Sequence, residues 1–135
     1  MNFTSQICTT KEQSGRLLAL GLNRETADMC WFNDMQKPFC APYKCFAEKA
    51  QDMKWVILPA WSLHRLIEMM PTYIGVVSED WTLNILQGKL IAYTNDERND
   101  FLFAQGAISL YDSIIAAIEW HIQTGHFNKE YLSEV

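Results

Sequence analysis

The chain has 135 residues, of which 49% are hydrophobic and 20% are charged. A chain of this length can bury a hydrophobic core without disulfides or metals, and this composition excludes an intrinsically disordered protein. The formal net charge is −5, and residues 55–135 carry four Lys or Arg against ten Asp or Glu. This acidic half would repel phosphate backbones and anionic lipids, so we expect neither a nucleic-acid nor a membrane partner.

Localisation and domain organisation follow from patterns that the sequence lacks. No apolar stretch approaches the ~20 residues needed to cross a bilayer, and the N-terminus shows no basic segment followed by an apolar one, as a signal peptide would. We therefore expect a cytoplasmic protein whose cysteines stay reduced. No repeat or linker interrupts the chain, which predicts a single domain over residues 1–135.

The first predicted helix lies within the stretch TTKEQSGRLLALGLN. Thr9 or Thr10 can cap its start, with Glu12 or Gln13 in position to complete a capping box. Gly21 is typical of the residue that follows the end of a helix.

The next stretch is harder to interpret. Residues 24–32 predict a short helical turn followed by an extended segment. From residue 33 to residue 52 the periodicity is lost, because Pro38 and Pro42 interrupt the backbone. The sequence FAEKAQ favours a helix, and a hairpin built from CWFND and KPFCAPY is the alternative, so the structure of residues 33–52 stays open.

The middle of the chain predicts a strand and a helix. A buried strand runs from Trp55 to Leu58 and is ended by Pro59. Ser62 then begins a short helix in which apolar residues recur every three or four positions, and Pro71 closes it.

After this helix the apolar residues alternate with a period of two, as in half-buried strands. Four such runs follow, TYIGVVSE, WTLNILQ, KLIAYTN and FLFAQ. Turn signals separate them at Glu79-Asp80, at Gln87-Gly88 and in residues 95–100. Short connections of this kind predict an antiparallel meander.

The strongest helix signal lies near the C-terminus. Ser109 and Asp112 form the S-x-x-D pattern of a helix start, and Gly125 ends the helix. An apolar stripe runs along one side of it, at Tyr111, Ile114, Ile115, Ile118 and Ile122. The elements together predict the α+β class: an antiparallel β-meander of about four to five strands with a long C-terminal helix and one or two shorter helices packed on it.

Three cysteines, Cys30, Cys40 and Cys45, lie close together in the sequence and could indicate a metal site, a disulfide or a reactive thiol. The spacing of Cys40 and Cys45 fits half of a zinc site, but the second close pair is missing. A disulfide would need an oxidising compartment. We expect no metal, no cofactor and free thiols that pack as small hydrophobic side chains; a nucleophilic Cys45, activated by Lys44 and a helix start, is the alternative.

The other ionisable residues have structural interpretations. His121 flanks the apolar stripe, where we expect it to pack at the edge of the core with one hydrogen bond, and His64 is expected to be solvated. Five acidic residues fall at predicted turns: Glu79, Asp80, Asp96, Glu97 and Asp100. They are expected to be solvated, with a loose cation site as the alternative.

Aromatic residues provide the candidates for partner binding. Among the five tryptophans, Trp31 and Trp81 lie near a loop and a turn, and tryptophan often anchors protein interfaces. Phe39 and Tyr43 give the irregular stretch more apolar surface than a solvated loop needs. The predicted partner-binding residues are therefore Trp31, Phe39, Tyr43 and Trp81.

Three segments in this order, TKEQSGRLLALGLNRETADMCW, PAWSLHRLIEMMP and LYDSIIAAIEWHIQTGHF, resemble small uncharacterised proteins encoded in prophages and mobile elements of gut anaerobic bacteria. The resemblance covers less than half of the chain and lies in capping and packing residues. It implies a bacterial cytosolic setting and a role in phage or element biology, and it transfers no catalytic residue.

These observations predict a small cytosolic domain that binds another protein. One alternative is a small enzyme that uses Cys45 or His121 in a cleft between the C-terminal helix and the sheet. The other is a structural subunit of a homo-oligomer.

Overall fold

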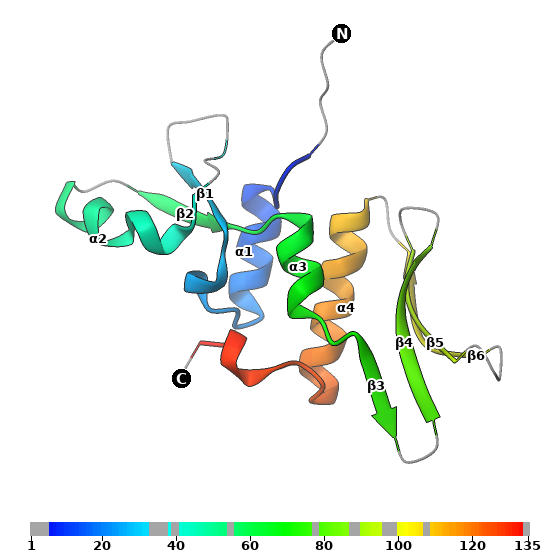
Figure 1. Ribbon diagram of the computed structural model, residues 1–135. Coiled ribbons are helices and arrows are strands. Elements are labelled where there is room, and N and C mark those ends of the chain that lie inside the picture. The colour runs from blue at the N-terminus through cyan, green and yellow to red at the C-terminus, as the bar shows by residue number, and fades with distance from the viewer. Residues whose placement is uncertain are drawn as a thin grey trace, which may run out of the picture. The chain divides into compact units, whose positions relative to one another are not determined.

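The computed structural model describes residues 6–32, 38, 41–53, 56–76, 79–86, 90–95, 100–106 and 109–133 (Figure 1). The elements follow in the order α1 (Lys11–Ala19), η1 (Arg24–Thr26), β1 (Met29–Phe32), α2 (Tyr43–Met53), β2 (Ile57–Ala60), α3 (Leu63–Met69), β3 (Tyr73–Val76), β4 (Glu79–Leu86), β5 (Leu90–Asn95), β6 (Asp100–Gly106), α4 (Leu110–Thr124) and η2 (Lys129–Tyr131). Helices and antiparallel sheets of two and four strands confirm the α+β class. None of the helices in these ranges is long and apolar enough to span a bilayer.

The chain divides into two compact units. Unit 1 comprises residues 1–67 and 129–135, and unit 2 comprises residues 68–128.

Unit 1 begins with the predicted helix, and its start confirms the capping box. The Thr10 hydroxyl accepts from the backbone N–H of Gln13 at 3.1 Å, and the Gln13 side chain accepts from the backbone N–H of Thr10 at 3.0 Å. Thr9, the alternative cap, is instead buried and bonded to Trp61. Its N–H donates to the Trp61 carbonyl at 2.9 Å, and its hydroxyl accepts from the Trp61 N–H at 3.1 Å.

The two-stranded sheet of unit 1 corrects two predictions. β1 pairs with β2, with Cys30 opposite Pro59, so the hairpin between CWFND and KPFCAPY is wrong for β1. Pro59 was expected to end the strand but lies inside it. A two-stranded sheet has an open edge on both strands, and a proline without an N–H fits such an edge.

The predicted helix around FAEKAQ is present as α2, which starts at Tyr43. Its Phe46 ring meets the Phe32 ring of β1 edge to face, with centroids 5.5 Å apart, and Ala50 is buried. Apolar contact with the sheet thus fixes α2, where sequence periodicity alone left two structures open.

The C-terminal segment of unit 1 pairs with the residues that follow α1. Leu22 and Leu132 form an antiparallel bridge. The N–H of Asn23 donates to the Tyr131 carbonyl, and the N–H of Ser133 donates to the Gly21 carbonyl, both at 2.8 Å. This pairing, called the terminal closure below, places η2 beside η1.

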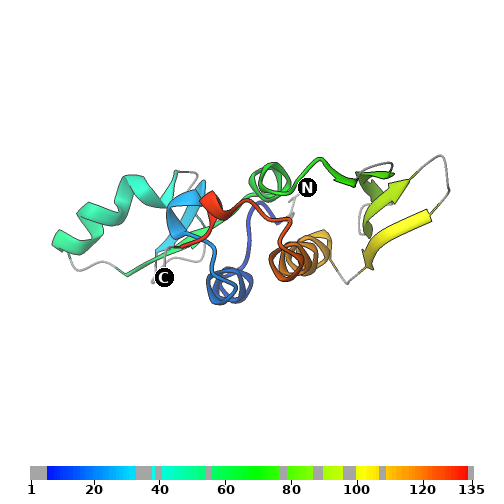
Figure 2. The ribbon, with the colours of Figure 1, turned by 90° about the horizontal axis from the view of Figure 1, so that it is seen from below.

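Unit 2 contains the predicted meander, with β3, β4, β5 and β6 side by side in sequence order. Helix α4 lies along one face of this sheet (Figures 1 and 2). Ile74, Trp81 and Tyr93 form the buried centre of the contact, and Phe103 and Trp120 pack against them.

In unit 2 the observed ends of α4 match the predicted ones, whereas the observed start of β4 does not. Ser109 caps α4 by accepting from the Asp112 N–H at 3.2 Å, and Gly125 ends the helix with a left-handed backbone. Glu79 and Asp80 were predicted to form a turn, but they belong to β4 and pair with β3. Because β4 therefore starts two residues earlier, Trp81 lies within the strand.

Two glycines allow a direct test of the backbone geometry of α1 and of the residue that follows its C-terminal cap. Gly21 has φ +102°, a conformation that costs a side chain about 1–2 kcal/mol, so Gly21→Ala should lower the unfolding free energy by that amount. Gly15, inside α1, has open space where a Cβ would lie, so Gly15→Ala should raise it by about 0.5–1 kcal/mol. Urea unfolding followed by tryptophan fluorescence measures both. A stabilising Gly21→Ala would contradict the backbone geometry described here.

Candidate functional site

A surface hollow of about 660 Å³ lies in unit 1. Its lining comes from η1, from α2 and from the C-terminal segment: Asn23, Arg24, Glu25, Tyr43, Ala47, Lys129, Glu130, Leu132 and Ser133. The terminal closure therefore builds the hollow, because it brings the C-terminal contribution next to η1.

The first wall of the hollow is η1 and the start of α2. Asn23 caps η1, its side-chain oxygen accepting from the Glu25 N–H at 3.0 Å. The N–H of Tyr43 donates to the Ala27 carbonyl at 3.4 Å, which holds the first residue of α2 beside η1. The Arg24 guanidinium lies 5.9 Å from the centre of the Tyr43 ring, within range of a cation–π contact.

Arg65 connects the two 3-10 turns that flank the hollow. Its Nε donates to the Thr26 carbonyl of η1 at 2.8 Å, and its guanidinium lies 5.7 Å from the centre of the Tyr131 ring of η2. The Thr26 hydroxyl in turn accepts from the indole N–H of the buried Trp61 at 3.0 Å. The hollow thus rests on the core of unit 1.

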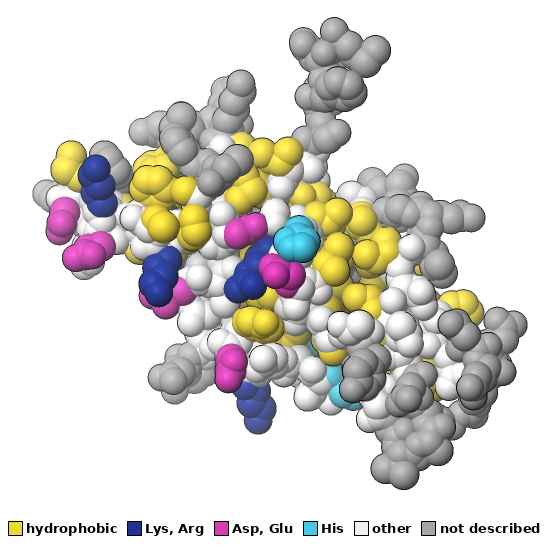
Figure 3. Space-filling model, in the orientation of Figure 1, with side chains coloured by type: hydrophobic (Ala, Val, Ile, Leu, Met, Phe, Trp, Pro, Cys, Tyr) yellow, Lys and Arg dark blue, Asp and Glu magenta, His cyan; other side chains and the backbone are white. Residues whose placement is uncertain are grey.

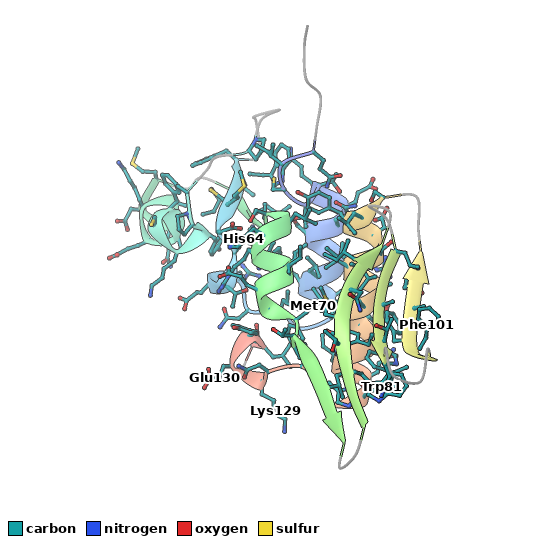
Figure 4. The ribbon with its side chains drawn as sticks, turned by 45° about the vertical axis from the view of Figure 1, so that its right-hand side comes forward. His64, Met70, Trp81, Phe101, Lys129 and Glu130 are labelled. Atoms are coloured by element: carbon teal, nitrogen blue, oxygen red, sulfur yellow. The ribbon has the colours of Figure 1, made fainter. Side chains whose placement is uncertain are left out.

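The ionisable side chains of the hollow are of both signs. Among the described lining residues, Arg24 and Glu25 come from η1 and Lys129 and Glu130 come from η2, so the formal charges of these residues balance. Lys129 and Glu130 project outward from η2 (Figure 4). On the face of unit 1 seen in Figure 3, cationic and acidic side chains of the described residues are interspersed.

The structure describes three of the four predicted partner-binding residues and places them in different surroundings. Tyr43 lines the hollow. Trp31 is half-buried against the small core of Cys8, Met29 and Ala60, and its indole N–H donates to the Thr9 carbonyl at 2.9 Å.

Trp81 and Phe39 complete this set. Trp81 is only 6% exposed and belongs to the core between the sheet and α4, so its ring is not part of the surface. Phe39 lies outside the described residues. Of the three predicted anchors that the structure describes, only Tyr43 lines the hollow.

No pattern in the sequence predicts the four charged residues that line the hollow with Tyr43. Arg24-Glu25 and Lys129-Glu130 are ordinary dipeptides, more than a hundred positions apart. The only signal, visible in retrospect, is that each is a cation followed by an acid in a short turn.

The described cysteines carry free thiols. Cys8 and Cys30 are buried and Cys45 is exposed, while Cys40 lies outside the described residues. Burial, with a smaller effect from Cys45, raises the pKa of Cys30, which favours the thiol over the thiolate that a metal or nucleophilic site needs. Within the described ranges no three His, Cys, Asp or Glu side chains are grouped to hold a metal.

The predicted loose cation site was expected to use acidic residues at neighbouring turns. Glu79 and Asp80 lie in β4 and Asp100 lies in β6, whereas Asp96 and Glu97 fall outside the described residues. His64 is exposed on α3, as expected.

His121 lies deeper than the predicted edge of the core, since its side chain is 0% exposed. Its Nε2 is 2.9 Å from the Tyr93 hydroxyl, and that hydroxyl donates to the Pro71 carbonyl at 2.6 Å. Because the Tyr93 hydroxyl donates its proton to the Pro71 carbonyl, it can only accept from His121, so the Nε2–H of His121 is the donor. Nδ1 is then a buried acceptor without a hydrogen-bond partner among the described residues.

These surroundings favour neutral side chains. Burial, with a smaller effect from His126, lowers the pKa of His121 to about 4, and burial raises the pKa of Tyr93. A neutral, enclosed imidazole fills space between α4 and the sheet, and a substrate could not reach it without opening that contact.

Comparison with known proteins gives no relative for this chain: no protein-family profile, no curated protein and no solved structure matches it. The resemblance to prophage proteins therefore stays a prediction.

The low pKa of His121 predicts how stability depends on pH. The unfolded histidine binds a proton near pH 6.5 and the folded one only near pH 4, so the unfolding free energy should fall by about 3 kcal/mol as the pH drops through this window. In His121→Gln this pH-dependent loss should largely disappear. The substitution itself should lower the unfolding free energy at neutral pH by about 0.5–2 kcal/mol. His64→Gln, at an exposed position, is the control and should keep the loss. Urea titrations at several pH values measure the unfolding free energy. If it fell with pH as steeply in His121→Gln as in the wild type, the low pKa of His121 would be contradicted.

Proposed function

We propose that this protein binds another protein through the hollow of unit 1, with Tyr43 as the central contact. The observation that carries the proposal is the surrounding of Tyr43, a half-buried aromatic ring beside Arg24 in a hollow with two cationic and two acidic side chains. Tyrosine and arginine are among the residues that contribute most to protein interfaces.

The chemistry of the lining favours a polypeptide over other ligands. Small-molecule sites are mostly apolar and enclose their ligand, whereas this hollow has charged residues on both sides. Nucleic-acid sites present an excess of positive charge, whereas the described lining residues of the hollow carry two basic and two acidic side chains. A polypeptide offers side chains of both signs together with apolar surface, which matches such a lining.

Two further expectations belong to this proposal. The protein would act in the cytoplasm as an accessory domain, a setting in which the free thiols of Cys8, Cys30 and Cys45 would stay reduced. The resemblance to prophage and mobile-element proteins supports a role in the biology of such elements. The enzyme alternative has less support, because His121 is enclosed in unit 2 and Cys45 lies on a helix of unit 1 with no described catalytic partner.

The proposal can be tested by capture with matched variants. The full chain is immobilised, retained proteins are identified by mass spectrometry, and the affinity of the purified partner is measured for each variant. Tyr43→Ala should weaken binding by about tenfold or more, since it removes an interface anchor. Arg24→Glu should weaken it as well, because it reverses one charge of the hollow.

Arg16→Glu is the control for charge. It makes the same change in net charge at an exposed position of α1 that does not line the hollow, so binding should be retained. Equal affinity for wild type, Tyr43→Ala and Arg24→Glu would show that the partner does not use the hollow.

A further inference from the structure

The charged side chains of the hollow differ in what they contact inside the protein. Among the described residues, the Arg24 guanidinium forms no ion pair and lies 5.9 Å from the centre of the Tyr43 ring. Within the same ranges neither Lys129 nor Glu25 pairs with a side chain of opposite charge. Glu130, by contrast, is already engaged in an interaction within the chain. Two cations and one carboxylate of the lining are therefore available to a ligand.

The uncharged residues of the lining provide an apolar contact. Tyr43 and Ala47 are four positions apart on α2 and so share one face of that helix, and Leu132 lines the hollow from the terminal closure. All three are half-buried, so part of each side chain stays accessible. The two neutral polar residues, Asn23 and Ser133, use their side-chain oxygens for hydrogen bonds to the backbone of η1 and of the residues before it.

We infer that the hollow binds a short acidic segment of the partner, in which carboxylates meet Arg24 and Lys129 and an apolar side chain contacts Tyr43. This inference rests on the proposed function and specifies the chemistry of the partner. A guanidinium offers paired N–H donors that match the two oxygens of a carboxylate, and the contact with the Tyr43 ring orients it. One basic side chain in the segment would pair with Glu25.

The size of the hollow favours a segment over a whole domain face. A volume of about 660 Å³ lies in the range of pockets that enclose one small ligand, roughly 300–1,000 Å³, whereas a standard protein interface uses about 20–30 residues on each side. A few residues of extended chain are enough to fill such a space.

The charge of unit 1 permits an acidic ligand. Residues 1–67 and 129–135 carry nine Lys or Arg against eight Asp or Glu, so unit 1 does not share the acidic excess of the rest of the chain. A nucleic-acid strand is also anionic, but its phosphates would meet the carboxylates of Glu25 and Glu130. A peptide can place a basic or neutral side chain there, which favours a peptide.

Selection from a phage-displayed library of random seven-residue peptides, on the immobilised full chain, tests the inference. We expect enrichment of peptides with at least two acidic residues beside an apolar one. A synthetic copy of a selected peptide should bind Arg24→Glu and Lys129→Glu at least about tenfold more weakly than the wild type, and its affinity should fall as salt rises. Arg16→Glu, which makes the same change in charge at an exposed position outside the hollow, should bind the peptide like the wild type.

A second selection, on Arg24→Glu itself, keeps the test decisive if that variant binds poorly for another reason. Reversal of this charge should change the enriched residues from acidic toward basic, which a chain that had lost its fold could not do. Enriched peptides without acidic residues, or acidic peptides that bind Arg24→Glu as tightly as the wild type, would overturn the inference.

The same measurements separate this inference from the proposed function. If no peptide is enriched while a captured protein still depends on Tyr43, the acidic segment is wrong and the proposed function stands. If both the captured protein and the peptides bind Tyr43→Ala as tightly as the wild type, both proposals fail. Displacement of the peptide by an equal concentration of a single-stranded oligonucleotide would show that the hollow selects negative charge alone, and would also overturn the inference.

Discussion

The pairing of the C-terminal segment with the residues that follow α1 is the interaction on which the candidate site depends. Ser133 and Leu22 are 111 positions apart, so their contact closes a loop that contains most of the chain. Such a closure costs conformational entropy, but the cost grows only slowly with loop length. This entropic cost is offset by two backbone hydrogen bonds, by burial of Leu22 and by the contacts of Arg65 with both 3-10 turns. Without this closure η1 would have no opposite wall.

The closure also determines the chemistry of the hollow. It sets two turns with the same order of charges, Arg24-Glu25 and Lys129-Glu130, around one aromatic ring. Neither turn is long enough to present a binding surface alone. A polypeptide that contacted both would gain charged and apolar contacts together, which is how protein interfaces combine specificity with affinity.

Much of the fold could be predicted from the sequence, because its signals are local. The capping box of Thr10 and Gln13, the cap of α4 at Ser109 and the four alternating runs each lie within a few residues, and all are present in the structure. Predictions failed where long-range contacts decide the outcome. Pro59 was expected to end a strand, but pairing with β1 keeps it inside β2.

The candidate site could be predicted only in part. Tyr43 was identified as a surplus aromatic residue in an irregular stretch, and it lines the hollow. Trp81 was selected because it follows a predicted turn, but β4 starts earlier and Trp81 packs toward α4. The charged residues of η2 could not be linked to η1, since no local pattern encodes a contact between the two ends of the chain.

Hydrogen exchange of the full chain, alone and with its captured partner, tests the central claim most directly. If the hollow binds the partner, three separate segments should gain protection together: residues 23–25, 43–47 and 129–133. Protection in unit 2 alone, or in just one of the three segments, would contradict the claim that the terminal closure builds the binding site.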